Sequence, residues 1–229
     1  MLENCLLKSD QIGETLNPLA GMIFHYDPHS SDTICEAAYL ATHIPVTVLV
    51  SPSNLWRMKE LYPKVPGAAD SIDVLPLLLK EKHLNTQRML RLMAFSDRDD
   101  AMPLYMESII RILKEMAVES MGASGLKYKA TLQRVNEEPF AREQKGPMRL
   151  RLQLLESFME TGMKAFKRTK SAYDIFKAEP GNLTIVDLSD PFVDPTSACV
   201  LFDICIALFL EDRRAVGRIL ALDEAHKVG

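Results

Sequence analysis

Short apolar runs that do not alternate with polar residues place the strongest constraint on the fold of this chain. Four such runs occupy residues 22–26, 46–50, 183–187 and 218–222. A strand with one face in water alternates apolar and polar residues, whereas a strand covered on both faces is apolar nearly throughout. The runs therefore predict an α/β fold, with a doubly wound, mostly parallel sheet that carries helices on both faces.

Segments with helical periodicity connect these runs. Residues 33–42 carry apolar side chains three and four positions apart, and Asp32 stands where a helix N-cap is expected. The strand–helix–strand order across residues 22–50 is typical of a βαβ unit with parallel strands. Further helical patterns lie at 54–62, 85–94, 103–119, 150–161 and 197–210.

The long stretch between the second and third runs predicts an insertion into the sheet. Residues from about 55 to 180 are mostly helical in pattern, and 122–147 is expected to be rich in loops because glycine and proline recur there. We therefore expect residues 1–229 to form a single domain that is interrupted by a helical insertion.

The overall charge gives little indication of a polyanionic partner. The formal net charge is −4, so no global attraction draws the chain to nucleic acid or to acidic membranes. Basic residues are mildly concentrated between Arg142 and Lys170. A solvated helix face and a nucleic-acid-binding patch both explain such a cluster.

Composition and cysteine placement predict a soluble intracellular protein, cytoplasmic or nuclear. The first eight residues are too short and too charged for a signal peptide, and no apolar run is long enough to span a membrane. Four cysteines lie in apolar surroundings without zinc-type spacing, which predicts buried reduced thiols. The histidines also lack metal-type spacing, so the sequence predicts no metal site made from protein ligands alone.

An acidic pair follows the last apolar run. Asp223 and Glu224 come directly after Ile219–Leu222, which is the Walker B pattern of P-loop ATPases. In that chemistry one carboxylate faces the Mg²⁺ of a nucleotide and the next orients the attacking water. The pair has a second interpretation as a cap for a following helix. A DEAH-box helicase fragment is a further alternative for residues 223–226, although no phosphate loop occurs in the 222 residues before Asp223.

Three spaced motifs together resemble the HerA/FtsK-type P-loop ATPases, which translocate DNA. They are Tyr-Asp-Pro-His at 26–29, Ile-Val-Asp-Leu-Ser at 185–189 and Leu-Ala-Leu-Asp-Glu-Ala-His at 220–226. The resemblance covers about residues 22–50 and 181–229 and implies a P-loop NTPase-like fold. It also implies Mg-ATP as cofactor, a homo-oligomeric ring, and DNA or another polymer as partner.

The same resemblance implies roles for individual residues. Glu224 would be the catalytic base, and Asp223 would bind Mg²⁺ through water. Asp187 would support the γ-phosphate, although a strand-terminal aspartate also caps the loop that follows it. Arg213 and Arg214 would be either trans-acting arginines of a ring or exposed turn residues.

The chain departs from this family where phosphate is bound. Ser30, Ser31 and Asp32 replace the glycine and acidic residue expected after Asp-Pro-His, and Gly-x-x-x-x-Gly-Lys-Ser/Thr occurs nowhere. By resemblance that loop would lie immediately before residue 1. Without its lysine and amide groups, nothing neutralises the β- and γ-phosphates. We therefore expect a truncated or degenerate site that is inactive alone, with a non-catalytic ATPase-fold scaffold or oligomer partner as the alternative function.

Overall fold

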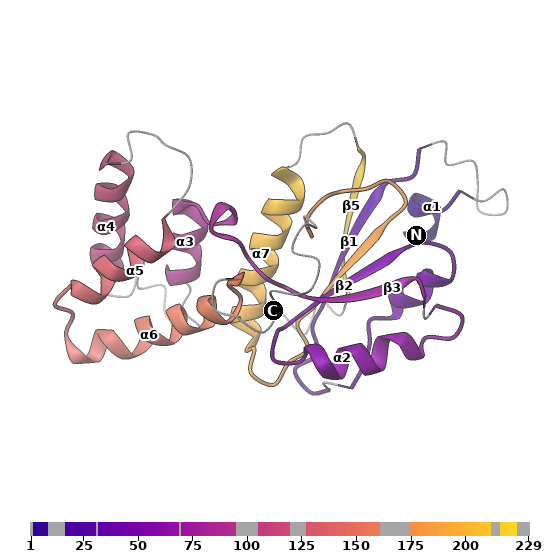
Figure 1. The fold of residues 1–229 in the computed structure, drawn as a ribbon, viewed down its shortest axis with the longest axis horizontal. Coiled ribbons are helices and arrows are strands. Elements are labelled where there is room, and N and C mark those ends of the chain that lie inside the picture. Colours follow the sequence, from indigo (N-terminus) through magenta and orange to yellow (C-terminus); the bar gives the residue numbers. More distant parts are fainter. Residues whose placement is uncertain are drawn as a thin grey trace. The chain divides into compact units, whose positions relative to one another are not determined.

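The computed structural model describes residues 2–8, 17–30, 32–68, 70–94, 105–119, 127–160, 175–211 and 216–223 (Figure 1). The chain forms two compact units. The sheet unit combines Met1–Leu77 with Ala172–Gly229, and the helical unit is Leu78–Ser171.

A five-stranded sheet forms the centre of the sheet unit, and all of its strand pairs are parallel. The order across the sheet is β3-β2-β4-β1-β5 (Figure 1). This confirms the predicted α/β class and parallel sheet. The strands are β1 (Ala20–His25), β2 (Val46–Val50), β3 (Ile72–Pro76), β4 (Leu183–Asp187) and β5 (Arg218–Leu222).

The strand β3 was missed by the prediction that the chain is helical from residue 55. Among the described residues between 55 and the start of β3, the helices are α2 (Leu55–Leu61) and the short 3-10 helix η2 (Tyr62–Lys64). Asp73, the second residue of β3, is exposed, and this polar residue interrupts the apolar pattern that marks the other strands. The strand pairs on one side only, with β2, because it lies at the end of the sheet order.

The segment between β1 and β2 also differs from its prediction. It contains a 3-10 helix, η1 (Glu36–Thr42), whose N-cap position is Cys35 and not Asp32. Asp32 instead forms an exposed ion pair with Arg57 of α2. The strands on either side of η1 are parallel, as predicted, but β4 lies between them. The sequence order of strands is therefore not their order in space.

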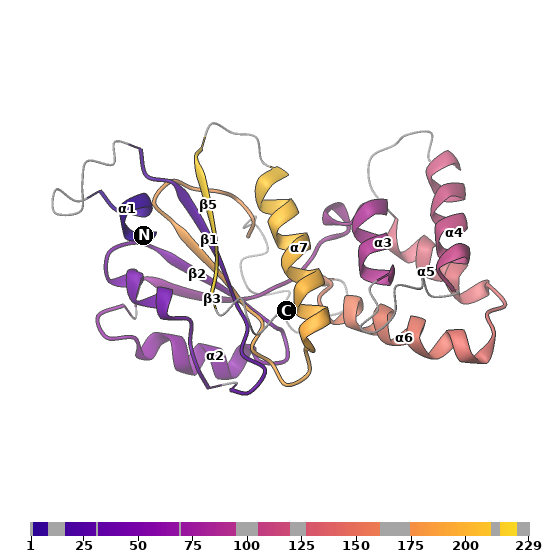
Figure 2. The same ribbon diagram turned by 180° about the vertical axis from the view of Figure 1, so that it is seen from behind.

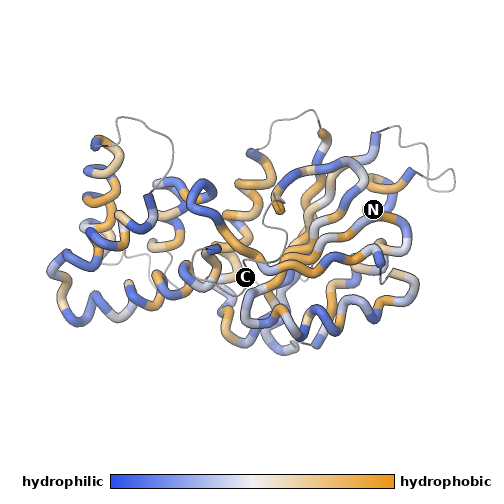
Figure 3. The backbone as a smooth tube through the Cα atoms, viewed as in Figure 1, coloured by the Kyte–Doolittle hydropathy of each residue, from blue (hydrophilic) through white to orange (hydrophobic). Residues whose placement is uncertain are grey.

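Both faces of the central strands are covered. Every residue of β1 is buried, although successive side chains of a strand point to opposite faces. Phe24 packs against Phe202 of α7 (Pro195–Glu211), with ring centroids 4.9 Å apart, so α7 covers one face (Figure 2). The strands of the sheet lie toward the hydrophobic end of the colour scale along most of their length (Figure 3).

A glycine in β1 allows the N-terminal helix α1 (Leu2–Leu6) to approach the sheet closely. A Cβ atom at Gly21 would lie 3.0 Å from Leu183 Cδ1 and 3.1 Å from Leu6 Cδ2. Any larger side chain would therefore displace two buried leucines, which explains a glycine inside a strand.

The helical unit contains more regular structure than predicted. The helices expected near 85–94, 103–119 and 150–161 are present, but 122–147 is not mainly loop, because α5 and most of the first half of α6 lie in it. Gly146 and Pro147 are inside α6, so these residues, which usually break helices, did not end this one. The unit comprises η3 (Glu81–His83), α3 (Thr86–Ala94), α4 (Tyr105–Glu119), α5 (Tyr128–Glu137) and α6 (Arg142–Ser157). Among the described residues of the chain, no helix has the length and apolar character needed to cross a membrane.

Candidate functional site

The carboxyl ends of β4, β1 and β5 lie level with one another and form a polar edge. In the sheet register His25 of β1 pairs with Asp187 of β4, and Phe24 pairs with Leu222 of β5. The backbone N–H of Asp223 donates to the carbonyl of Phe24 at 2.9 Å, so the chain stays hydrogen-bonded to β1 for one residue beyond the end of β5. Asp187, His25 and Asp223 therefore form a row across three neighbouring strand ends, where open parallel sheets bind ligands.

One oxygen of Asp223 has two partners from distant parts of the chain. Oδ2 lies 2.9 Å from Nδ1 of His25 and 3.5 Å from the thiol sulfur of Cys35. His25 and Cys35 are buried, whereas the Asp223 side chain is 30% exposed. The cluster thus has an open side, and the carboxylate lies on it.

Asp187 lies deeper in the same edge and is fully enclosed. Its Oδ2 accepts a 2.6 Å hydrogen bond from the hydroxyl of Tyr62, and its Oδ1 accepts one from the backbone N–H of Ser189 at 2.9 Å. Both Tyr62 and Asp187 are at most 1% exposed. The Tyr62 oxygen also accepts from the backbone N–H of Cys35 at 3.3 Å, which links the two aspartates.

The loop after β4 is held by further polar contacts. The Ser189 hydroxyl accepts from the backbone N–H of Asp27 at 2.9 Å, and its carbonyl accepts from Asn54 Nδ2 at 2.7 Å. Ser53 donates to the buried Asp190. The edge is therefore a connected hydrogen-bonded network that fixes the positions of its carboxylates.

Burial changes the acid–base behaviour of this edge. It raises the pKa of the Cys35 thiol, and the nearby charge of Asp223 adds to the effect. Burial likewise raises the pKa of Tyr62, with the charge of Asp187 as the next cause. Cys205, inside α7, has a pKa raised by burial alone. These groups are therefore neutral in the folded chain at physiological pH.

A loss of stability at alkaline pH follows from the two buried cysteines. Above about pH 8.5 the unfolded chain releases thiol protons that the folded chain keeps, so the free energy of unfolding falls as pH rises, by about 1.4 kcal/mol per pH unit for each thiol. We expect urea unfolding followed by circular dichroism to show this decline between pH 8 and pH 10. Cys205→Ala should make the fall of the unfolding free energy with pH less steep, by the contribution of one thiol. Stability that is constant up to pH 10 would contradict the expectation.

The structure brings two of the predicted site residues to one edge and gives them different surroundings. Asp223 is partly open, as a ligand-binding carboxylate requires, whereas Asp187 caps its own loop through Ser189, as the alternative interpretation held. Glu224, the predicted catalytic base, lies outside the described residues, as do Arg213, Arg214 and His226.

Three residues of this edge were missed by sequence reasoning. His25, Cys35 and Tyr62 lie between 125 and 198 residues away from the aspartates that they contact. No local spacing could reveal such partners, although the position of His25 at a strand end was visible in the sequence. All four cysteines are free. Cys35 and Cys205 are buried, as predicted, whereas Cys5 and Cys199 are only half-buried.

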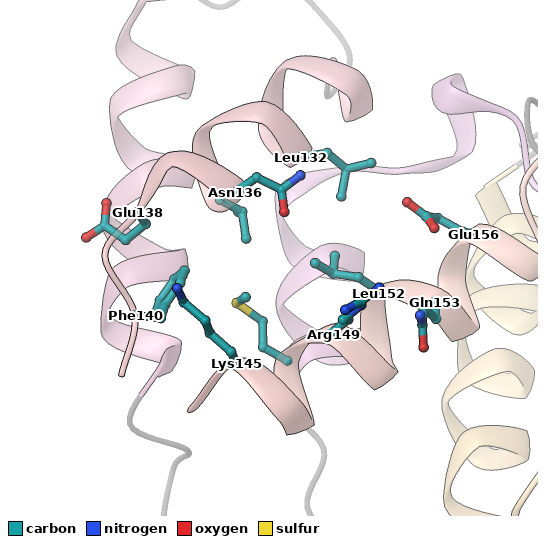
Figure 4. A pocket seen from close by; sticks show the side chains of 11 residues that line it. Leu132, Asn136, Glu138, Phe140, Lys145, Arg149, Leu152, Gln153 and Glu156 are labelled. Atoms are coloured by element: carbon teal, nitrogen blue, oxygen red, sulfur yellow. The ribbon is translucent and has the colours of Figure 1, made fainter. Parts of the chain in front are cut away.

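A pocket in the helical unit has a different character. It encloses about 440 Å³, and Figure 4 shows its lining side chains, which come from α5, α6 and the segment between them. Lys145 and Arg149, from the basic cluster, line it together with Glu138 and Glu156. Opposite charges thus share this surface, which does not favour a nucleic-acid-binding patch there. None of the predicted site residues lines this pocket.

No model of a known protein family matches the chain, and neither a characterised protein nor a solved structure is significantly similar to it.

Proposed function

We propose that the chain is the sheet core of an ATPase of the HerA/FtsK type whose own nucleotide site is incomplete. Its role would be that of an ATPase-fold subunit in a larger assembly, such as a ring that acts on DNA or another threaded polymer. By itself the chain would not hydrolyse ATP.

The observation that supports this proposal is the arrangement of the three motif-bearing strands. The strands β4, β1 and β5 are adjacent and parallel, so the residues that carry the resemblance end at one edge. A Walker B carboxylate belongs at the carboxyl end of a strand in an open parallel sheet, and Asp223 lies there.

Two features support an incomplete site. The 229 residues contain no phosphate-binding loop. In addition, Asp223 Oδ2 is already in contact with a histidine nitrogen and a cysteine sulfur. Mg²⁺ prefers oxygen ligands and water, so these neighbours do not make a good magnesium environment.

The proposal predicts that the purified chain neither binds nor hydrolyses Mg·ATP. Addition of millimolar Mg·ATP should leave the thermal unfolding midpoint unchanged, because a ligand stabilises only the state that binds it. A phosphate-release assay should give the same background rate for the natural chain, Glu224→Gln and Asp223→Asn. Turnover that disappears in Glu224→Gln would show instead that the site is complete.

The family assignment has its own test. If the gene encodes an in-frame Gly-x-x-x-x-Gly-Lys-Ser/Thr before Met1, the extended protein should gain Mg·ATP stabilisation, and Asp223→Asn should reduce it. If the extended protein carries that loop and still shows no nucleotide effect, the HerA/FtsK assignment is wrong. Light scattering of the natural chain tests the oligomer separately. A chain that forms a ring should have the molar mass of an oligomer in solution and not that of a monomer.

A further inference from the structure

The side chains of His25, Cys35 and Asp223 converge on one point from three separate segments. His25 ends β1, Cys35 precedes η1 and Asp223 follows β5. Their donor atoms, one nitrogen, one sulfur and one oxygen, all lie within 4.8 Å of one another. Among the described residues, this is the group whose composition and spacing suit a metal ion.

We propose that these three residues form a binding site for a zinc-type divalent cation. Nitrogen and sulfur donors favour zinc and similar borderline-soft metals over Mg²⁺. The inference concerns a resident metal and does not depend on the ATPase proposal.

Two of the three distances between donor atoms are close to those of a small metal site, and the third, between a ring nitrogen of His25 and Cys35 Sγ, is within 4.8 Å. Ligand–zinc distances of about 2.0–2.3 Å in a tetrahedral site place the ligand atoms roughly 3.3–3.8 Å apart. Cys35 Sγ and Asp223 Oδ2 are 3.5 Å apart, and His25 Nδ1 and Asp223 Oδ2 are 2.9 Å apart. A shift of the exposed carboxylate by a fraction of an ångström would open the second distance to that range.

The charges of the cluster also suit a partly buried divalent cation. A thiolate from Cys35 and the carboxylate of Asp223 together balance a charge of +2, and His25 binds as a neutral ring. The resulting site is neutral overall, so it avoids the cost of an unbalanced charge beside two buried side chains. On binding, the thiol proton passes to solvent. Nδ1 of His25 carries the ring proton while it donates to the Asp223 carboxylate, so the ring must change to the tautomer with its proton on Nε2 before Nδ1 can bind the metal.

The site is accessible to solvent on one side. His25 and Cys35 are at most 5% exposed, whereas the Asp223 side chain is 30% exposed. A cation can therefore enter on the side of the carboxylate. Three protein ligands leave a fourth tetrahedral position for water or an external ligand, which is the arrangement of zinc sites that remain open.

Co²⁺ is the most direct probe, because it replaces zinc in tetrahedral sites and absorbs light when bound to a thiolate. The full chain, freed of metal with a chelator, is titrated with Co²⁺. We expect one ion per chain and a thiolate-to-cobalt charge-transfer band. Equimolar Zn²⁺ should abolish the band, and a large excess of Mg²⁺ should not, which separates this site from a magnesium site.

Variants assign the ligands. Cys35→Ser should remove the charge-transfer band and lower Co²⁺ affinity by about 100-fold or more. Cys205→Ala is the matched control, since it deletes a buried thiol outside the cluster and should keep the band. Asp223→Asn, at the exposed ligand, should lower the Co²⁺ affinity similarly. This variant tests the site in place of Cys35→Ser if circular dichroism shows that Cys35→Ser does not fold.

Three results would overturn the proposal. They are the absence of stoichiometric Co²⁺ binding, a band that persists in Cys35→Ser, and equal loss of the band in Cys205→Ala. Each would mean that the three side chains form a hydrogen-bonded cluster without a metal. None of these results depends on ATP, so they leave the proposed function to its own tests.

Discussion

Phe24→Ala is expected to destabilise the sheet unit by about 3–5 kcal/mol, as the removal of a large buried aromatic side chain commonly does. Phe24 is 1% exposed in β1, a strand that pairs on both sides, and its ring lies against Phe202 of α7. The substitution would remove this ring contact and leave a cavity between the sheet and the helix. Urea unfolding monitored by circular dichroism measures the loss.

Phe192→Ala is the matched control for this change. Phe192 is 81% exposed in the loop before α7, so its removal should alter the free energy of unfolding by no more than about 0.5 kcal/mol. If the two variants had equal stability, Phe24 would not be a core residue and the placement of α7 on β1 would be wrong.

Tyr62→Phe is expected to cost about 2–3 kcal/mol, because a buried carboxylate would lose a hydrogen-bond donor. The hydroxyl of Tyr62 donates to Asp187 at 2.6 Å, and water cannot easily replace it where both residues are at most 1% exposed. The ring itself remains, so the loss reports on the hydroxyl. Chemical denaturation of the purified variant measures it.

A double-mutant cycle distinguishes this hydrogen bond from a general packing effect. Tyr62→Phe should cost much less when Asp187 is already asparagine, since the charge that needs the donor is gone. Tyr39→Phe, at a tyrosine that is 54% exposed, should be nearly neutral. Equal costs of Tyr62→Phe in the two backgrounds would refute the assigned role of the hydroxyl.

Much of the sheet could be predicted because β1, β2 and β4 are largely buried on both faces, and because β5 is also apolar although none of its residues is buried. Continuous apolar runs identified β1, β2, β4 and β5 to within two residues. The strand β3 escaped because Asp73 interrupts its pattern, and one exposed side chain is enough to hide a five-residue strand. The helices α5 and α6 were obscured because glycine and proline usually mark loops, whereas Gly146 and Pro147 lie within α6.

The candidate site was predictable only in part. Asp187 and Asp223 were visible because each follows an apolar strand, and parallel strands bring such residues to one edge. Their different environments were not visible. Asp187 is enclosed by Tyr62 and Ser189, whereas Asp223 is partly open beside a histidine and a cysteine.

The sequence by itself determined that this chain builds a parallel α/β sheet and that carboxylates stand at its carboxyl edge, because hydrophobic periodicity and strand ends are local properties. Only the tertiary structure decided that β4 lies between β1 and β2, and that His25 and Cys35 meet Asp223. Those contacts join residues as many as 198 positions apart, so they depend on how the strands are ordered in space, which no local pattern specifies.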